Sequence, residues 1–562
     1  MSSICSLIKG LSLCVAVSLV FGQIAKGATT SVTEKPSAAP SVPGQYVVQL
    51  KKNQALFGTV ALERTLHAKI LKSVRPDMIV VERNKNEDRT NVVKELNANP
   101  AVIIAEPNYI FHAFRTPNNP EYAKVWGLNN RGAVDTEGTL GVSGVDIGME
   151  KAWDITTGSR NVVVAVVDTG VDFSIPGLKN NAWVNEAELH GKPGVDDDGN
   201  GYIDDINGFN FVANNGDVKD DNGHGSHCSG TIGAEGDNGV GLPGINWQVS
   251  IMAVKFLDSE GGGSLDNAVK ALDYARKNKA QILSNSWGGN AVSAILQKAV
   301  QDTHDAGELF MAAAGNDGQD NDHRNTIPAG YSKDMDNVVA VAAVDNRGEL
   351  AFFSNYGLKN VDIAAPGVNI YSTVPATMDA TGFKALSGTS MACPHAAGVA
   401  ALLLSANPNW KYIDIKQRMI ATARPLASLN GKVSSGGMID AYYALTNQKP
   451  PADPNDAAVW ADSKPYSVST PHPYTENMDV KYTVQIPGAK KVSVHFSKFR
   501  TELGYDTVQF FNSKGESLGK WSGSQDGRFS PIAEGDTLVL EFKSDRSNND
   551  FGFDVDKVNV VR

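Results

Sequence analysis

Three short glycine-rich motifs carry side chains that together could perform acyl transfer. Asp168 ends the apolar run VVVAVVD, His224 lies in DNGHGSHCSG, and Ser390 lies in SGTSMACPHAAG. A serine hydroxyl is a weak nucleophile, so a neutral histidine must accept its proton during the attack. A buried carboxylate fixes the tautomer of that histidine and stabilises the imidazolium that forms. Glycines beside the histidine and the serine let backbone and substrate approach closely.

The oxyanion that develops during acyl transfer needs hydrogen-bond donors of its own. Ser390 begins an expected helix, ACPHAAGVAALLLS, so its backbone N–H should be unpaired and close to the positive end of the helix dipole. Pro394 is expected in the first turn of this helix, where proline is tolerated. Asn316 follows the apolar run LFMAAAG and is the candidate for the second donor. Losing such a donor typically lowers turnover by about 10²–10³.

These motifs occur in the order Asp, His, Asn, Ser, and together they resemble those of the subtilisin-type serine proteases, the subtilases. The matching segments are DTG at 168–170, GHGSH at 223–227, AAGN at 313–316 and GTSMACPH at 388–395. The resemblance implies a catalytic triad of Asp168, His224 and Ser390, with Asn316 as the side-chain oxyanion donor.

The same resemblance also implies where the substrate binds. In subtilases an extended substrate adds as a strand to the region that SNSWGG (284–289) matches. The residues implied to line the pocket for the P1 side chain are Ser286, Trp287, Gly288 and, in the AAAG run at 312–315, Ala314. Small residues there imply room for a large apolar or aromatic P1 side chain. Packing in the core is the alternative role for Trp287.

The segments around these motifs predict an α/β fold. The runs NVVVAVVD, VSIMAVKFL, QILSNSWGG, LFMAAAGN and VVAVAAV are apolar on both faces, which is typical of buried parallel strands. Helices are expected between them at 264–278 and 291–306. The pattern predicts a doubly wound parallel sheet in a subtilisin-like catalytic domain at 116–446, with functional groups at the strand ends.

The front of the chain predicts an export signal and a small α+β domain. Residues 1–27 have one charge before an apolar run that is too short for a membrane span of about 20 residues. A linker is expected at 28–43. The domain at 44–115 should contain strands at 45–50, 78–82 and 102–111 and helices at 60–72 and 92–97. The resemblance implies that it is a propeptide, an inhibitor and folding aid, cleaved within 111–120.

The end of the chain differs from the central part in its composition and in its pattern of apolar residues. Residues 447–458 are rich in proline and aspartate and predict a linker. Alternating strands separated by turns then predict an all-β sandwich at 459–562. This segment resembles a CUB-type domain without its usual cysteines, with a kexin-style P domain as the alternative. The CUB resemblance implies a calcium site at Glu502, Asp506 and Asp545.

The segment DDDGNGYIDD (196–205) predicts a structural Ca²⁺ site. Its oxygen-bearing residues occupy positions 1, 3, 5, 7 and 9 of an EF-hand-like loop, the seventh through a backbone carbonyl: Asp196, Asp198, Asn200, Tyr202 and Asp204. The glutamate of position 12 is absent. A solvated acidic turn is the alternative, but so many carboxylates without a cation would repel one another. A second calcium site of many subtilases is in doubt, because Gly177 stands where they have an aspartate.

Cys228 and Cys393 are expected near the catalytic residues, each three or four positions after His224 or Ser390. Two buried, inert thiols are the first interpretation. A disulfide between the two helices is the alternative.

The composition and the net charge limit the kinds of function that the protein can have. The 562 residues are 41% hydrophobic and 20% charged, which is typical of folded proteins, and the net charge of −11 argues against nucleic acid as a partner. We expect a secreted or extracellular endopeptidase, with the periplasm as the alternative, made as a monomeric zymogen without a membrane anchor. Its partners would be protein or peptide substrates and its own propeptide. A catalytically silent binding protein and a kexin-like enzyme that uses Asp317, Asp320 and Asp322 to select basic residues are the other hypotheses.

Overall fold

The computed structural model describes residues 41–562 except 52–58, 86, 110–115, 136–137 and 452–455. The expected signal peptide and most of the first linker lie outside the described residues, as does part of the expected cleavage region. These residues form an N-terminal domain (41–109), a central domain (116–451) and a C-terminal domain (456–562).

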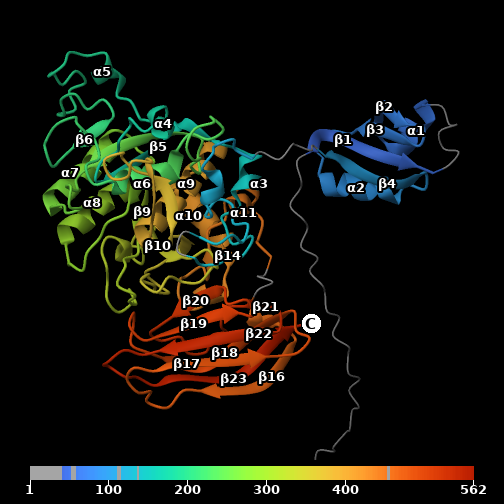
Figure 1. Ribbon diagram of the computed structural model, residues 1–562. Coiled ribbons are helices and arrows are strands. Elements are labelled where there is room, and N and C mark those ends of the chain that lie inside the picture. Colours follow the sequence, from blue (N-terminus) through green and yellow to red (C-terminus); the bar gives the residue numbers. More distant parts are fainter. Residues whose placement is uncertain (1–40, 52–58, 86, 110–115, 136–137, 452–455) are drawn as a thin grey trace, which may run out of the picture. The chain divides into compact units, whose positions relative to one another are not determined.

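The N-terminal domain contains one four-stranded antiparallel sheet in the order β2-β3-β1-β4 and two helices (Figure 1). The strands are β1 (Ser41–Leu50), β2 (Lys69–Arg75), β3 (Met78–Glu82) and β4 (Val102–Tyr109), and the helices are α1 (Thr59–Leu66) and α2 (Arg89–Ala98). Leu62, Leu66, Val92 and Leu96 of the helices share one core with the sheet. The expected α+β domain is therefore present.

The helix predicted over 60–72 is wrong in its second half. Helix α1 ends at Leu66, and His67 has a positive φ of 50°, a conformation that no α-helix contains. The next residues form β2, which pairs with β3 as an edge strand, with Lys69 opposite Glu82 and Ile70 opposite Val81. Pairing between strands thus overrides the helical spacing of Ile70 and Leu71.

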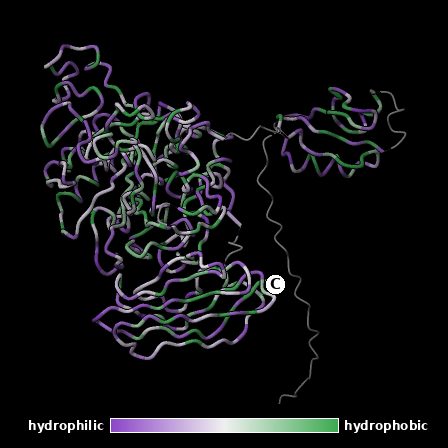
Figure 2. Tube along the Cα trace, viewed as in Figure 1, coloured by the Kyte–Doolittle hydropathy of each residue, from purple (hydrophilic) through white to green (hydrophobic). Residues whose placement is uncertain are grey.

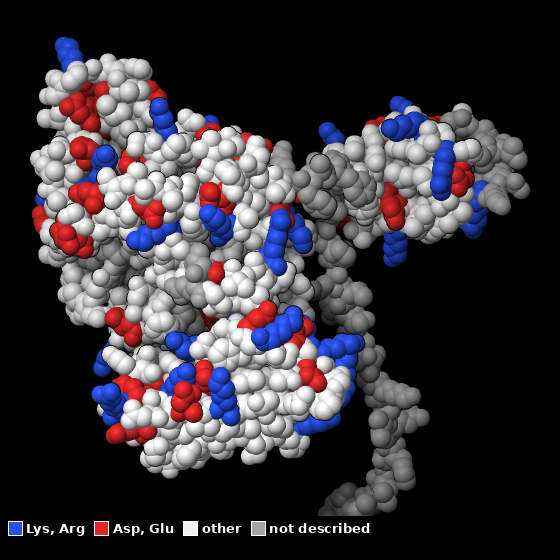
Figure 3. Space-filling view, viewed as in Figure 1, with Lys and Arg blue, Asp and Glu red and all other residues white. Residues whose placement is uncertain are grey.

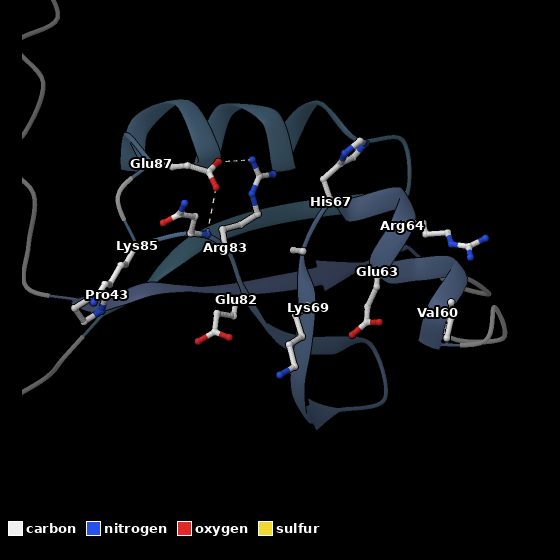
Figure 4. Close-up of a pocket in the computed structure, with 12 residues that line it drawn as sticks. Pro43, Val60, Glu63, Arg64, His67, Lys69, Glu82, Arg83, Lys85 and Glu87 are labelled. Atoms are coloured by element: carbon white, nitrogen blue, oxygen red, sulfur yellow. Dashed lines mark hydrogen bonds and ion pairs between the residues drawn. The ribbon is translucent and has the colours of Figure 1, made fainter.

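An open hollow of about 820 Å³ lies on the N-terminal domain and is lined mostly by charged side chains. Figure 4 shows the ion pair between Arg83 and Glu87, two of the residues that line it. Acidic and basic groups therefore already pair within this hollow, and it holds none of the residues that sequence motifs assign to catalysis.

The central domain is built on a nine-stranded sheet in the order β14-β15-β11-β10-β9-β8-β5-β7-β6. The strands are β5 (Gly158–Asp168), β6 (Gly208–Asn210), β7 (Gln248–Lys255), β8 (Ile282–Asn285), β9 (Leu309–Ala313), β10 (Val338–Val344), β11 (Ile363–Pro366), β14 (Arg424–Pro425) and β15 (Gly437–Met438). All neighbours pair in parallel except β14 and β15. The five predicted apolar strands are β5, β7, β8, β9 and β10.

Helices cover both faces of this sheet, as a doubly wound fold requires (Figure 1). Val164 and Val166 of β5 belong to one core with α6 (His224–Gly233) and α9 (Thr389–Ala406), whereas Ala165 and Val167 belong to a second core with α7 (Leu265–Lys277) and α8 (Ala294–Asp305). The first core also includes α3 (Met149–Trp153), α4 (Pro176–Lys179), α10 (Tyr412–Ala421) and α11 (Ala441–Thr446). Alternate residues of one strand therefore face opposite layers.

The described part of the chain contains one helix with the length and hydropathy of a membrane span, α9, and 83% of it is buried inside the protein. It is the core helix of the central domain. This domain also contains α5 (Glu186–Leu189) and the hairpin of β12 (Ile370–Thr373) and β13 (Phe383–Leu386).

The C-terminal domain is all-β, as predicted, with two four-stranded antiparallel sheets. One has the order β16 (Asp462–Ser469), β23 (Gly552–Val561), β18 (Lys491–Arg500) and β21 (Ala533–Glu534), and the other β17 (Asp479–Gln485), β22 (Thr537–Lys543), β19 (Thr507–Asn512) and β20 (Ser517–Trp521). Hydrophobic and hydrophilic residues alternate along these strands (Figure 2), and both sheets contribute to one core. This is the sandwich pattern.

Candidate active site

The sheet brings the predicted catalytic residues to one edge. Asp168 is the last residue of β5, and β8 and β9, which follow it in the sheet, end just before Ser286 and Asn316. The carboxyl ends of parallel strands meet at the same edge, where the ligands of such sheets bind. His224 and Ser390 lie at the first and second positions of α6 and α9.

Asp168 and His224 form a direct pair. Nδ1 of His224 lies 2.7 Å from Oδ1 of Asp168, whose side chain is fully buried, while the imidazole is 26% exposed. The same carboxylate oxygen accepts the N–H of Thr169 at 2.7 Å. A neutral imidazole that donates from Nδ1 keeps a free lone pair on Nε2, which is the form that a general base requires.

The close approach of α6 to the end of β5 depends on Gly225. A Cβ atom at this position would lie 2.1 Å from the carbonyl oxygen of Gly170 and 3.2 Å from Cβ of Asp168. No side chain fits there, so the glycine after His224 is what allows the imidazole to reach the carboxylate.

The surroundings of His224 raise its pKa, whereas those of two other histidines in the motifs lower theirs. Burial lowers the pKa of His224, but the charge and hydrogen bond of Asp168, with a smaller effect of Asp220, outweigh it and leave the pKa above its ordinary value. Burial lowers the pKa of His227 to about 3 and that of His395 to about 4. These two stay neutral in the core, so His224 is the histidine suited to cycle between its two forms.

Ser390 lies beside α6 at the beginning of α9. Its carbonyl oxygen accepts from Sγ of Cys228, one turn beyond His224, at 3.4 Å. Its hydroxyl donates to the carbonyl oxygen of Ser286 at 3.0 Å, and the hydroxyl of Ser286 donates back to the Ser390 carbonyl at 2.9 Å. The nucleophile candidate is thus held at the edge of the sheet, next to the helix that carries His224.

Pro394 does not lie in the first turn of α9, contrary to the prediction. The helix begins at Thr389, so Pro394 is inside it, four residues after Ser390. Proline has no N–H to give to the carbonyl four residues earlier. The carbonyl of Ser390 is therefore free for the side chains of Ser286 and Cys228.

Asn316 is fixed by Thr389 in the orientation of an oxyanion donor. Its Oδ1 accepts from the N–H and the hydroxyl of Thr389 at 2.8 and 2.9 Å. This leaves Nδ2 as the outward donor. A Cβ atom on Gly388 would lie 3.5 Å from both Nδ2 of Asn316 and N of Ser390, and the latter N–H has no acceptor among the described residues. Both donors therefore lie beside the backbone of Gly388.

The predicted substrate-binding residues divide into two groups. Gly288 is exposed at the surface, and Ser286 and Trp287 are next to it on the chain after β8. Ala314 is fully buried, and its carbonyl accepts from the side chains of Asn321 and Asn355. Its placement argues against direct contact with a substrate. Trp287 is half-buried and packs edge-on against Phe256, with 4.9 Å between the ring centroids.

The carboxylates after Asn316 are engaged in the local fold. Asp322 accepts the N–H groups of Lys359 and Asn360, and Asp320 binds the N–H of Asp322 and the ring of His323. Asp317 is exposed. This arrangement gives no support to an acidic pocket for basic P1 residues.

Both cysteines of the central domain are free, buried thiols. Burial raises the pKa of Cys228 well above its ordinary value and that of Cys393 to about 12. They are therefore protonated and unreactive at neutral pH, in agreement with the first interpretation.

The acidic loop brings together a different ligand set from the predicted one. Carboxylate oxygens of Glu188, Asp196 and Asp198 lie within 4.8 Å of one another. The side chain of Asp204 instead accepts the N–H of Gly194 with both oxygens, at 3.0 and 2.9 Å, and Asn200 donates to Asp198. Acidic side chains gather at the part of the central domain that carries α5 (Figure 3).

Glu188 was missed because it precedes the loop motif. It lies in α5, is 5% exposed, and accepts the N–H groups of Asp197 and Asp204 at 2.7 and 2.9 Å. A glutamate in the short amphipathic segment EAEL, just before an acidic loop, is the only sequence signal for it. Carboxylate oxygens are the hard ligands that Ca²⁺ prefers, so the donor set fits this ion.

The loop at 236–244 has a protein donor at its centre. Nδ2 of Asn119 donates to the carbonyls of Glu235 and Val240 and to Oδ1 of Asn238, at 3.2, 2.6 and 3.0 Å. Gly177 is buried in α4. An amide nitrogen of the protein thus lies within hydrogen-bond distance of three oxygens around this loop.

The acidic residues predicted in the C-terminal domain do converge. Carboxylate oxygens of Glu502, Asp506 and Asp545 lie within 4.8 Å of one another. Asp506 is fully buried, and Oε2 of Glu502 is buried without a partner among the residues that the structure describes. A buried carboxylate oxygen without a donor is the arrangement that a bound Ca²⁺ would satisfy.

Residues 159–456 match the Subtilase family, and residues 458–556 match the CUB domain. A thermophilic serine proteinase from Bacillus sp. (strain AK1) is 34% identical over 458 residues, which cover 78% of this chain and 98% of that protein. Thermitase from Thermoactinomyces vulgaris is 36% identical, covering 52% of this chain and 92% of that protein. Subtilisin-like protease 1 from Plasmodium vivax is 37% identical, and the match spans about half of its length, 52%.

Proposed function

The chain belongs to the subtilase family of serine endopeptidases and carries a C-terminal CUB domain, and we propose that it is a secreted endopeptidase made as a zymogen. The observation that carries this proposal is the 2.7 Å contact between Asp168 and His224, next to a serine at the start of α9. Such a constellation performs acyl transfer whatever fold presents it.

In the proposed mechanism, Oγ of Ser390 attacks the carbonyl carbon of the scissile peptide and passes its proton to Nε2 of His224. The buried charge of Asp168 stabilises the imidazolium. The N–H of Ser390 and Nδ2 of Asn316 stabilise the oxyanion. His224 then protonates the departing amine, which leaves an acyl-enzyme on Ser390. Water, deprotonated by His224, hydrolyses this ester and restores the enzyme.

The exposed backbone after β8 is the proposed binding edge for an extended peptide. Gly288 is exposed, and a peptide strand can pair with such an edge through main-chain hydrogen bonds, whereas the N–H and carbonyl of Gly289 are already paired with Ile327. Because Asp320 and Asp322 are engaged elsewhere, we favour an apolar P1 side chain over a basic one.

The N-terminal domain is proposed to be the propeptide. It has its own sheet and core, and it precedes a central domain dominated by non-local parallel pairing, which folds slowly. A folding aid that also blocks the site until it is cleaved would serve both needs, and secretion is supported by the sequence of residues 1–27.

The proposal is tested by labelling and cleavage together. The mature protein is expected to cleave a mixed peptide library, with apolar side chains enriched at P1, and a fluorophosphonate should abolish this cleavage. Mass spectrometry should find one phosphonyl adduct, on the peptide that contains Ser390. Full cleavage after complete labelling, or an adduct confined to another serine, would exclude the proposed mechanism.

Replacement of Asn316 by alanine is expected to lower kcat by about 10²–10³ with a small change in KM, because the lost hydrogen bond forms with the oxyanion and not with the ground-state carbonyl. Steady-state kinetics on a peptide substrate measure this. Asn290→Ala is the matched control, since Asn290 is exposed in the same region and has no contact with Thr389. Equal kcat for the two variants would remove Asn316 from the mechanism.

Structural calcium is proposed at two places: Glu188, Asp196 and Asp198 in the central domain, and Glu502, Asp506 and Asp545 in the C-terminal domain. Bound Ca²⁺ would neutralise the mutual repulsion of these carboxylates and fix the loops that carry them.

Removal of calcium with a chelator is expected to lower the thermal unfolding midpoint, because a site at 100 times its Kd stabilises the fold by about 2.7 kcal/mol. Glu188→Gln and Asp506→Asn should each reduce the difference between calcium-loaded and chelated protein. Asp204→Asn is the control, because the carboxylate of Asp204 binds Gly194. A difference that depends on Asp204 and not on Glu188 would restore the ligand set predicted from the sequence.

A further inference from the structure

The first turn of α6 is held by side chains from outside the helix. Its N-cap residue, Gly223, has no side chain and a φ of 101°. Asp220 supplies the cap instead: Oδ1 accepts the N–H of Gly223 and Oδ2 accepts the N–H of Ser226, both at 2.8 Å. Helices leave their first N–H groups unpaired, so this carboxylate fixes the end of the helix that carries His224.

The same carboxylate is connected to the strand that carries Asp168. The hydroxyl of Thr169 donates to Oδ1 of Asp220 at 2.8 Å and accepts the N–H of Gly225 at 2.9 Å. Thr169 directly follows Asp168, and Gly225 directly follows His224. One Thr–Asp pair therefore sets the distance between the two backbones whose side chains make the 2.7 Å contact.

Asp220 is also a buried carboxylate, and no cationic side chain among the described residues forms an ion pair with it. It is 1% exposed and Thr169 is fully buried. The nearby ammonium group of Lys255 binds Asp221 at 2.7 Å and the carbonyls of Thr169 and Leu257 at 2.6 and 3.0 Å. The charge of Asp220 therefore acts on the imidazole of His224, in the same direction as that of Asp168.

Apart from Asp168 and the Lys255–Asp221 pair, the titratable groups around His224 on α6 and α9 are uncharged at neutral pH. On α6 itself, His227 is neutral and Cys228 is a thiol. On α9, Cys393 is a thiol and His395 is neutral. The β5 end contributes Asp168, and the β7 end contributes Lys255 with its partner Asp221.

We propose that Asp220 is a positioning residue for catalysis: it fixes His224 against Asp168 through Thr169 and the first turn of α6, and it places a second negative charge beside the imidazolium that forms when Ser390 is deprotonated. This inference rests on the proposed function. Both effects favour the proton transfer from Ser390 to His224 and leave substrate binding unaffected, so they should act on kcat and on the pH profile.

The test is Asp220→Asn, which keeps the size of the side chain, removes the charge and replaces one of the two acceptor oxygens by an amide donor. We expect kcat to fall about tenfold or more with KM unchanged. The acid limb of the kcat/KM profile should move to lower pH by about 0.5 unit, because loss of a nearby negative charge makes the imidazolium a stronger acid. Asp217→Asn, an exposed aspartate three residues earlier, is the control and should leave both readouts unchanged.

A second pair of variants separates geometry from charge. Thr169→Val removes the hydroxyl link without changing any charge, so it should lower kcat and leave the acid limb in place. Thr169→Ser keeps the hydroxyl and should restore most of kcat. An Asp220→Asn enzyme with wild-type kcat and a wild-type acid limb would overturn the proposal, as would a Thr169→Val enzyme with full activity.

If Asp220→Asn does not mature, the pKa of His224 is measured without turnover. NMR titration of histidine-labelled full-length Ser390→Ala and Ser390→Ala/Asp220→Asn compares the two imidazoles, with His224 assigned by its loss in a His224→Gln chain. A lower pKa in the double variant supports the proposal, and an equal one overturns it. Activity that survives Ser390→Ala would instead refute the proposed function, so the two failures are distinguishable.

Discussion

Replacement of Ser390 by alanine is expected to lower kcat by about 10⁶, the magnitude that loss of the catalytic serine has in subtilisin. Residual hydrolysis would come from the oxyanion donors and from substrate binding alone. The fold should persist, because the hydroxyl makes one hydrogen bond, to Ser286, and the backbone of the α9 start is held by Asn316. The variant should also accumulate as an unprocessed precursor.

Kinetics on a peptide substrate and the mass of the purified protein measure these two effects. Ser405→Ala is the matched control, since Ser405 lies on the same helix and its hydroxyl bonds only the carbonyl of Ala401. Addition of active wild-type enzyme should cleave the Ser390→Ala precursor, which shows that the precursor is folded and cleavable. Normal maturation of the variant by itself would contradict self-processing.

Replacement of Asp168 by asparagine is expected to lower kcat by about 10⁴. An asparagine amide that turns its N–H₂ toward Nδ1 of His224 favours the tautomer with the proton on Nε2, which cannot accept a proton from Ser390. The variant also loses the charge that raises the pKa of His224, so any remaining activity should extend to lower pH.

The measurement is kcat as a function of pH, with Asp172→Asn as the control. Asp172 is also buried and lies four residues further along the chain, but its carboxylate binds only Ser174. We expect that control to keep kcat within a few-fold of wild type. An Asp168→Asn enzyme within tenfold of wild type would show that the 2.7 Å contact has no catalytic role.

The strands that present the site could be predicted because each is specified locally. A run such as VVVAVVD is apolar on both faces, which only a covered parallel strand accommodates. The glycine after His224 is needed because of a distant segment: a Cβ atom on Gly225 would lie 2.1 Å from the carbonyl oxygen of Gly170. Residues whose role follows from strand ends and helix starts were therefore placed correctly at one edge of the sheet.

Features that depend on long-range partners could not be predicted. Ile70 and Leu71 continue the helical spacing predicted over 60–72, yet they lie in β2, which pairs with β3. Glu188 lies outside the loop motif and reaches it only through the fold, while Asp204 satisfies the motif but binds Gly194. The capping role of Asp220 was equally hidden, because its partner Thr169 is 51 positions away along the chain. Sequence spacing contains no information about which side chain such a group will meet.

The small core of the N-terminal domain bears on what would happen to this domain after it is cleaved from the enzyme. A fragment of about 70 residues that buries only a few side chains has little free energy of folding once it is alone. After severance it would spend part of its time unfolded, as extended chain that an endopeptidase can digest. Destruction of the released fragment would then make activation irreversible, so a single cut would commit the molecule to its active form.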